Sequence, residues 1–184
     1  MFWYKLKIFA PLALSCGLML FFSACKPDLK EIGTAEKYFD IKGFFKRDTA
    51  ILNKLRKPVF KTVTHNGQTE SKQILIKNWG KELDLFIGSD INKPAWKNSY
   101  SIVNENGLLI YKSKEPELHV VQMVIKMDKQ KVNWILIYTR TKNVLYQTNE
   151  KLTYYPDSLY IIEKDQKVRL MGKNHYEIKG MIKD

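Results

Sequence analysis

The feature that most constrains this chain is a succession of short β-prone runs separated by polar turns, which fills residues 99–182. Successive runs begin about ten residues apart, and such short connections make consecutive strands antiparallel neighbours. Asn106-Gly107 lies between two of these runs, and Asn66-Gly67 lies between an earlier pair. Asn-Gly favours a tight hairpin because both turn residues adopt a positive φ. The sequence therefore predicts a large antiparallel meander sheet, with strands over 59–64, 68–77, 99–103, 108–111, 118–127, 132–139, 144–154, 159–163, 168–171 and 176–182.

Two segments that precede the meander have helical periodicity. Apolar residues recur at helical spacing over 36–56, which predicts a helix there. Asp40 offers a cap for a later start, and Pro58 ends the segment because proline cannot continue a helix. A second helix is predicted to begin after Asn78, which can cap it. The apolar stripe of this second helix consists of Trp79, Leu83, Phe86, Ile87 and Ile91.

These patterns predict an α+β fold in which two N-terminal helices pack on a large antiparallel meander sheet, curved like a half-barrel. The run 132–138 is apolar at both odd and even positions. A strand with two apolar faces is expected at the centre of a sheet, buried on both sides. The two helices are the obvious cover, and we expect a partly apolar concavity beneath them.

The start of the chain has the composition of a secretory signal. Lys5 and Lys7 supply positive charge, an apolar run follows over 8–22, and small residues precede Cys25. The apolar run is shorter than the ~20 residues that a transmembrane helix needs. We therefore expect residues 1–24 to be a signal peptide. An uncleaved signal anchor, or a buried helix with an incidental cysteine, is the alternative.

Residues 22–25 (Phe-Ser-Ala-Cys) resemble the lipobox of bacterial lipoproteins, with phenylalanine in place of the commoner leucine. The resemblance implies cleavage between Ala24 and Cys25 and attachment of diacylglycerol to the Cys25 thiol. Residues 25–35 would then form the lipidated N-terminus and tether, and 36–184 a single α+β domain. A lysine rather than an aspartate follows the cysteine, which favours the outer membrane of the cell envelope and leaves the leaflet open.

The cysteine content and the net charge restrict the types of site and the types of partner that the chain can have. The chain has two cysteines, Cys16 and Cys25; the first leaves with the signal and the second is lipidated, so thiol catalysis, cysteine-based zinc sites and disulfides are excluded. Removing Lys5 and Lys7 lowers the net charge from +12 to +10. Because an exported protein has little access to nucleic acid, the expected anionic partners are lipid phosphates, lipopolysaccharide or acidic glycans. A solvated lysine-rich surface is the alternative.

No catalytic constellation is evident. The three histidines (His65, His119 and His175) have no metal-ligand spacing, and no phosphate-binding glycine loop or nucleophile elbow occurs. We therefore expect no metal and no cofactor. Among many aromatic residues that fit a sheet, three could instead contact a ligand or partner. Those three are Trp96 in a Lys-Pro-Ala-Trp-Lys loop, and Trp134 and Tyr138 in the doubly apolar run.

The segments 78–100 and 154–160 (the latter Tyr-Tyr-Pro-Asp-Ser-Leu-Tyr) resemble uncharacterised lipoproteins of Bacteroidota. The resemblance covers most of the mature chain and implies a lipid-anchored protein of a diderm envelope, with no assigned activity. The predicted architecture of this chain, though not its sequence, also resembles the half-barrels of lipoprotein-sorting factors. The sequence thus favours a non-enzymatic binding or assembly module, with an apolar concavity for a lipid or acyl chain. An envelope hydrolase acting on glycan or lipid, or a protein scaffold with an exposed Trp96, is the alternative.

Overall fold

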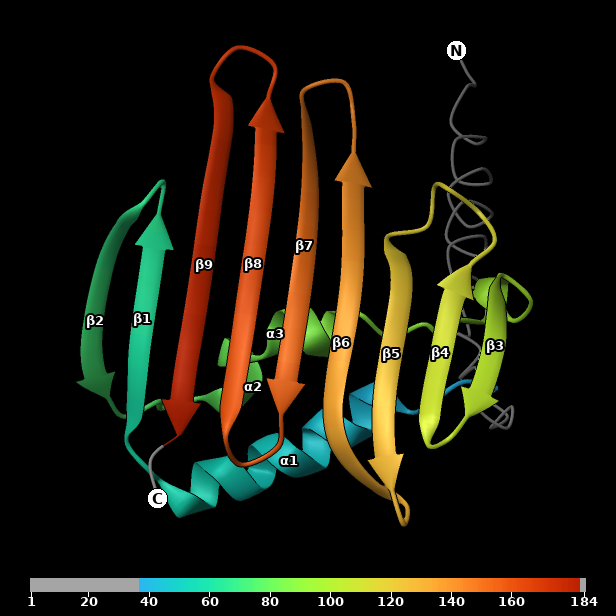
Figure 1. Ribbon diagram of the computed structural model, residues 1–184, viewed down its shortest axis with the longest axis horizontal. Coiled ribbons are helices and arrows are strands. Elements are labelled where there is room, and N and C mark those ends of the chain that lie inside the picture. The colour runs from blue at the N-terminus through green and yellow to red at the C-terminus, as the bar shows by residue number, and fades with distance from the viewer. Residues whose placement is uncertain (1–36, 183–184) are drawn as a thin grey trace, which may run out of the picture. The chain divides into compact units, whose positions relative to one another are not determined.

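The computed structural model describes residues 37–182, which form one antiparallel sheet with helices against it (Figure 1). The strands are β1 (Val59–His65), β2 (Gln68–Ile74), β3 (Tyr100–Glu105), β4 (Leu108–Ser113), β5 (Val120–Asp128), β6 (Lys131–Lys142), β7 (Tyr146–Tyr155), β8 (Leu159–Val168) and β9 (Gly172–Ile182). They form a nine-stranded sheet in the order β2-β1-β9-β8-β7-β6-β5-β4-β3. The sheet is open, with β2 and β3 at its two edges. The predicted large antiparallel sheet is thereby confirmed.

From β3 to β9 every strand pairs with its neighbour in sequence, as expected of a meander. The Asn-Gly hairpins are also confirmed, with Asn66 and Asn106 at φ of 49° and 50° and a glycine of positive φ after each. β1 and β2 form a hairpin of their own, and β1 also makes a long-range pairing: it lies antiparallel to β9, with Val59 opposite Ile182. The N-terminal hairpin therefore extends the meander at its last strand.

The last hairpin differs from the sequence prediction. A turn was expected at 172–174, but β8 continues unbroken to Val168 and the turn is formed by residues 169–171. Gly172, at φ 86°, already belongs to β9 and pairs with Val168. The polar stretch 164–167 remains in the strand because it pairs with β7 on one side and β9 on the other. Local polarity therefore indicated a turn that the two neighbouring strands override.

The first helix, α1 (Ile41–Leu55), begins at the predicted later start. The Asp40 side chain accepts a hydrogen bond from the Gly43 N–H at 2.6 Å. A Cβ on residue 43 would lie 1.8 Å from Asp40 Oδ2, so a larger residue at that position would force the Asp40 carboxylate to move. Gly43 weakens helix propensity, but its lack of a side chain allows the cap.

In place of one second helix the chain forms α2 (Trp79–Glu82) and α3 (Asp84–Gly88), followed by the 3₁₀ turn η1 (Pro94–Trp96). Asn78 caps α2 as predicted, through a hydrogen bond from the Lys81 N–H at 3.0 Å. Leu83 then leaves the helical conformation at φ −104° and ψ 22°. The expected count of two helices is not confirmed, and neither is their placement before the sheet, because β1 and β2 precede α2.

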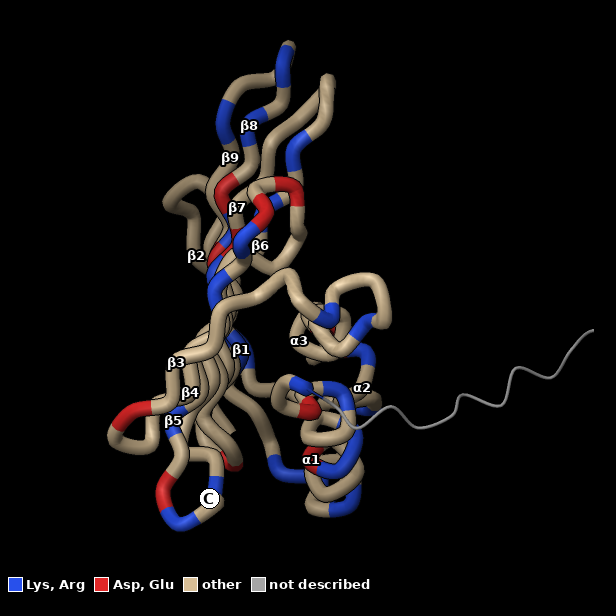
Figure 2. The backbone as a smooth tube through the Cα atoms, turned by 90° about the vertical axis from the view of Figure 1, so that its right-hand side faces the viewer, with Lys and Arg blue, Asp and Glu red and all other residues tan. Residues whose placement is uncertain are grey.

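All three helices lie on one side of the sheet, as Figure 2 shows. The core is formed between them and the sheet, where α1 contributes Ile41, Phe45 and Leu52. Two polar contacts join the layers. In one, the Tyr154 hydroxyl of β7 donates to the buried Asp48 carboxylate of α1. In the other, Glu82 of α2 accepts from Lys61 Nζ of β1 at 2.5 Å and from the Tyr160 hydroxyl of β8.

Burial of the doubly apolar run differs between its two faces. Ile135 and Ile137 are fully buried against the helices, whereas Leu136 is half-buried and Tyr138 is exposed. The expectation that 132–138 is covered on both sides is therefore wrong for one side. The helices cover a single face of the sheet and leave the other face of the central strands in water.

This one-sided cover predicts different stability losses for two neighbours in β6. Ile137→Ala should lower the free energy of unfolding by about 2–5 kcal/mol, because it opens a cavity in a closed core. Leu136→Ala should lower it by less than about 1.5 kcal/mol, because water already reaches that side chain. Urea unfolding of both variants measures the difference. Equal losses would contradict the burial described here.

Candidate functional site

The face of the sheet that points away from α1, α2 and α3, here named the uncovered face, carries an ordered pattern of side chains. Residues paired across antiparallel strands project to the same side, so the register defines rows of neighbours. One row, here named the apolar band, crosses the sheet from β3 to β8. It consists of Val103, Ile110, Val124, Leu136 and Ile161, with Thr153 between the last two.

Trp134 and Tyr138 flank the apolar band in β6. They lie two residues on either side of Leu136, so all three project from the uncovered face. Trp134 is half-buried and Tyr138 exposed, while Val124 in the neighbouring strand is buried without any helix above it. Two of the three aromatic residues predicted as contacts are thus brought together on a surface open to a partner.

Trp96, the third predicted contact, does not join them. It lies in η1 and packs, half-buried, against the core on the helix side of the sheet. The Lys93 ammonium lies 4.0 Å from the centre of its ring, and its backbone carbonyl accepts a hydrogen bond from the Tyr38 hydroxyl at 3.0 Å. Trp96 therefore has partners within the fold.

Beyond the apolar band the uncovered face becomes charged. The next row contains Lys151 and Glu163, whose side chains form an ion pair of 2.7 Å. A further row contains Arg140, Asn149, Asp165 and His175, and the last contains Lys142, Gln147, Lys167 and Lys173. The polarity of this face therefore changes along the strands from apolar to charged and finally to basic.

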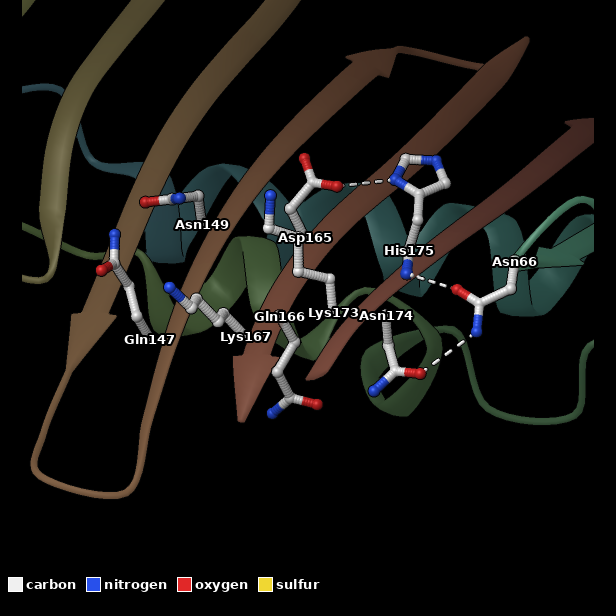
Figure 3. Close-up of a pocket in the computed structure, with 9 residues that line it drawn as sticks. All are labelled: Asn66, Gln147, Asn149, Asp165, Gln166, Lys167, Lys173, Asn174 and His175. Carbon is white, nitrogen blue, oxygen red and sulfur yellow. Dashed lines mark hydrogen bonds and ion pairs between the residues drawn. The ribbon is translucent and has the colours of Figure 1, made fainter. Parts of the chain in front are cut away.

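A polar hollow of about 490 Å³ lies at the charged end (Figure 3). Within it, His175 Nδ1 lies 2.8 Å from Asp165 Oδ1, between the paired strands β9 and β8. The His175 N–H donates to Asn66 Oδ1 at 2.8 Å, so the turn between β1 and β2 is held against β9. The hydrogen bond that the Asp165 carboxylate accepts from the imidazolium raises the pKa of His175, with smaller contributions from Glu177 and Glu163.

A second hollow of about 620 Å³ adjoins the first, and Asn149 lines both. It is bordered by Leu136 and Tyr138 on one side and by Arg140 on the other. The two hollows thus connect the apolar band to the polar end of the same face. A ligand lying along β6 would meet apolar, aromatic and then basic groups in succession.

The polar hollow offers groups for proton exchange and for polar or ionic binding. Its lining contains no serine, threonine or cysteine, so the His175–Asp165 pair has no hydroxyl or thiol side chain to activate there. No group of histidine, cysteine and acidic residues suited to a metal occurs within residues 37–182. Lys167 and Lys173 instead favour an anionic group.

Sequence reasoning missed the His175–Asp165 pair because it placed the last turn three residues too late. With the turn at 169–171, the two residues are direct partners across β8 and β9. Residues 164–167 (Lys-Asp-Gln-Lys) are all polar, so local periodicity gave no signal for a strand there. Ala24 and Cys25, predicted as the cleavage and lipidation site, lie outside the described residues.

No protein-family model matches the chain, and neither a curated protein nor a solved structure matches it. In the part of the chain that the structure describes, none of the helices has the length and apolar character needed to span a bilayer.

Replacing Asp165 should lower the pKa of His175. The Asp165→Asn substitution removes the carboxylate that stabilises the imidazolium, so the pKa moves toward that of an ordinary histidine. The ion pair stabilises the fold fully at pH values below the pKa of an unfolded histidine, and this contribution disappears as pH rises through the raised pKa. NMR titration of the imidazole measures the shift. Asp128→Asn, at the end of β5, is the control, and an equal shift of the His175 pKa in that variant would contradict the pairing.

Proposed function

We propose that this protein is a lipid-anchored lipoprotein of the bacterial cell envelope that binds a partner protein, without catalysis, through the uncovered face of its sheet. The observation that supports binding most directly is the apolar band, which lies on the face that no described helix covers. Val103 of the band is exposed, and Ile110, Leu136 and Ile161 are half-buried. Apolar side chains that stay partly in water in one band are typical of an interaction site.

Anchoring rests on the sequence of the N-terminus. Residues 22–25 supply the lipobox-like motif, and Cys25 supplies the thiol to which diacylglycerol would be attached. One acyl chain gives only marginal membrane binding, whereas two or three chains hold a protein on the bilayer for long times. Residues 26–36 would connect this anchor to the first described element. The lysine after Cys25 favours the outer membrane.

A protein is the partner class that fits this face best. Sites for small apolar ligands enclose most of the ligand surface in a cleft. The apolar band instead extends in the open from β3 to β8, and the space on the other side of the sheet is filled by Phe45, Phe86 and their neighbours. The adjoining row with Lys151 and Glu163 adds charged groups of both signs, which suit the polar rim of a protein interface.

Hydrolysis of an envelope glycan or lipid is the second candidate, and its support is the His175–Asp165 pair. Such a pair can act as a general base, but the hollow that contains it has no hydroxyl or thiol side chain for it to activate. Direct attack by water would be required. Binding is therefore the stronger proposal.

Acylation is tested at the two cysteines. Cells grown with an alkyne-tagged fatty acid should label the wild-type protein and the Cys16→Ser variant equally, because Cys16 is removed with the signal. The Cys25→Ser variant should lose the label and run as an uncleaved precursor. Mass spectrometry of the mature N-terminal peptide identifies the acyl groups. Labelling that persists in Cys25→Ser would contradict the proposed anchor.

Partner binding is tested by cross-linking in cells. A photoreactive benzophenone residue at Tyr138 should give a discrete adduct, because that side chain is exposed beside the apolar band. The same residue at Ile51, which is exposed on α1, is the control. Adding Leu136→Asp should abolish the Tyr138 adduct while the far-ultraviolet circular dichroism is retained. Adducts of equal yield at both positions, or adducts that survive Leu136→Asp, would contradict a site on this face.

A further inference from the structure

Two neighbouring hairpins, β6–β7 and β8–β9, have their turns at the same end of the sheet, where the strands end away from α1 (Figure 1). The turn between β6 and β7 comprises residues 143–145, and the turn between β8 and β9 comprises residues 169–171. The Arg169 N–H donates to the Leu145 carbonyl at 2.9 Å, so the β7–β8 ladder continues into the turns and holds them side by side. These two turns are here named the paired tips.

The paired tips carry the most exposed large apolar side chains of the described residues. The exposed fractions are 94% for Leu170, 80% for Met171, 78% for Val144 and 67% for Leu145. Hairpin turns are normally polar, because their residues have no core to enter. Four large apolar residues on two adjacent turns therefore form an exposed apolar cluster with no role in the fold.

The turn between β6 and β7 is also preorganised by its own hydrogen bonds. The Asn143 side chain accepts hydrogen bonds from the backbone N–H groups of Leu145 and Tyr146, each at 2.9 Å. The Asn143 N–H in turn donates to the Tyr146 carbonyl at 2.9 Å. Because the turn is held by its own hydrogen bonds, Val144 and Leu145 are presented outward without a further ordering cost.

Basic residues lie next to this apolar cluster, on the strand ends that lead to it and in the turn at Arg169. Figure 2 shows lysine and arginine along the ends of the strands that lead to the paired tips. Asp165 is the only acidic residue in 140–149 and 164–175, and it is paired with His175. The basic collar consists of Arg140, Lys142, Lys167, Arg169 and Lys173.

We propose that the paired tips are a membrane-contact site, which inserts Val144, Leu145, Leu170 and Met171 into the headgroup region of an anionic lipid bilayer. The basic collar would then lie at the level of the lipid phosphates. Apolar side chains at the acyl boundary, with lysine and arginine above them, are the combination that binds bilayer surfaces. This site does not depend on acylation of Cys25, and its residues are separate from the apolar band proposed to bind a protein.

The shape of the site favours a bilayer over a protein partner. The apolar groups project from the ends of two hairpins and form a small convex surface. A stable protein interface needs about 800 Å² from each partner, far more than four side chains can supply. A bilayer accepts a narrow apolar projection without a complementary pocket, and its anionic headgroups match the basic collar in charge.

Insertion is tested with a fluorescent label on the mature chain, residues 25–184, because the apolar run 8–22 of the precursor would bind lipid by itself. Cys25→Ser removes the remaining native cysteine, so that the label occupies a single thiol and the result is independent of acylation. An environment-sensitive dye is placed on Leu170→Cys. Leu75→Cys is the matched control, because Leu75 is also an exposed leucine, at 63%, and it follows the end of β2 opposite the Asn66–Gly67 turn.

The dye at Leu170→Cys should show a blue shift and a several-fold rise in emission with vesicles of phosphatidylcholine and phosphatidylglycerol, and nitroxide lipids labelled near the headgroup should quench it. The dye at Leu75→Cys should change little. Reversing two charges of the collar, with Lys167→Glu and Arg169→Glu, should raise the lipid concentration needed for half the response by about tenfold or more.

Three results would overturn the proposal. The first is a Leu170→Cys dye that does not respond to anionic vesicles, or responds no more than the Leu75→Cys dye. The second is a response that survives the double charge reversal unchanged. The third is an equal response to unlabelled protein in the absence of lipid, which would assign the paired tips to contacts between two copies. Loss of acylation at Cys25 would change none of these outcomes, so the two proposals fail separately.

Discussion

One constraint shapes the rest of this structure: the helical cover is too small for the sheet. The three α-helices span 15, 4 and 5 residues, whereas the sheet has nine strands of up to 12 residues. They can exclude water from one face only. Ile135 and Ile137 are therefore buried, while Leu136 of the same strand remains partly in water on the opposite face. The apolar band is the direct consequence, because these strands carry apolar residues on both faces and only one face is covered by helices.

Buried polar pairs fix the positions of α1 and α2 on the sheet. Asp48 of α1 accepts from the Tyr154 hydroxyl, and burial raises the pKa of this carboxyl despite that hydrogen bond. The folded protein thus binds the Asp48 proton more tightly than the unfolded chain, so the contribution of this group to stability falls as pH rises through its raised pKa. Glu82 of α2 is held by Lys61 and Tyr160, and the Tyr160 ring lies over Gly180. A Cβ at residue 180 would lie 2.1 Å from this ring, so the position requires glycine.

Local signals predicted the local structure well. The Asn-Gly hairpins, the Asp40 cap and the succession of strands from residue 99 follow from turn chemistry and periodicity, which act over a few residues. Pairing of β1 with β9 could not be predicted in this way, because it joins residues more than one hundred positions apart. The same limit explains the misplaced last turn, which hid the His175–Asp165 pair. It also explains why the sequence could not rank the three aromatic candidates. Only the fold places Trp96 on the helix side of the sheet and Trp134 and Tyr138 on the uncovered face.

The proposed sites are related by their positions along the same strands. On β6 the sequence runs from Leu136 in the apolar band, through Arg140, to Lys142 beside the paired tips. A strand rises about 3.3 Å per residue, so the apolar band lies roughly 20 Å from the end of this strand. If the paired tips contact a bilayer, the strands stand at an angle to its surface, and a protein bound to the apolar band is held clear of the lipid headgroups. An acyl anchor alone would fix only the N-terminus of the chain and leave the sheet free to turn. A second contact at the paired tips would set the orientation in which the uncovered face is presented, because two separated attachments to one surface restrict rotation that a single attachment allows.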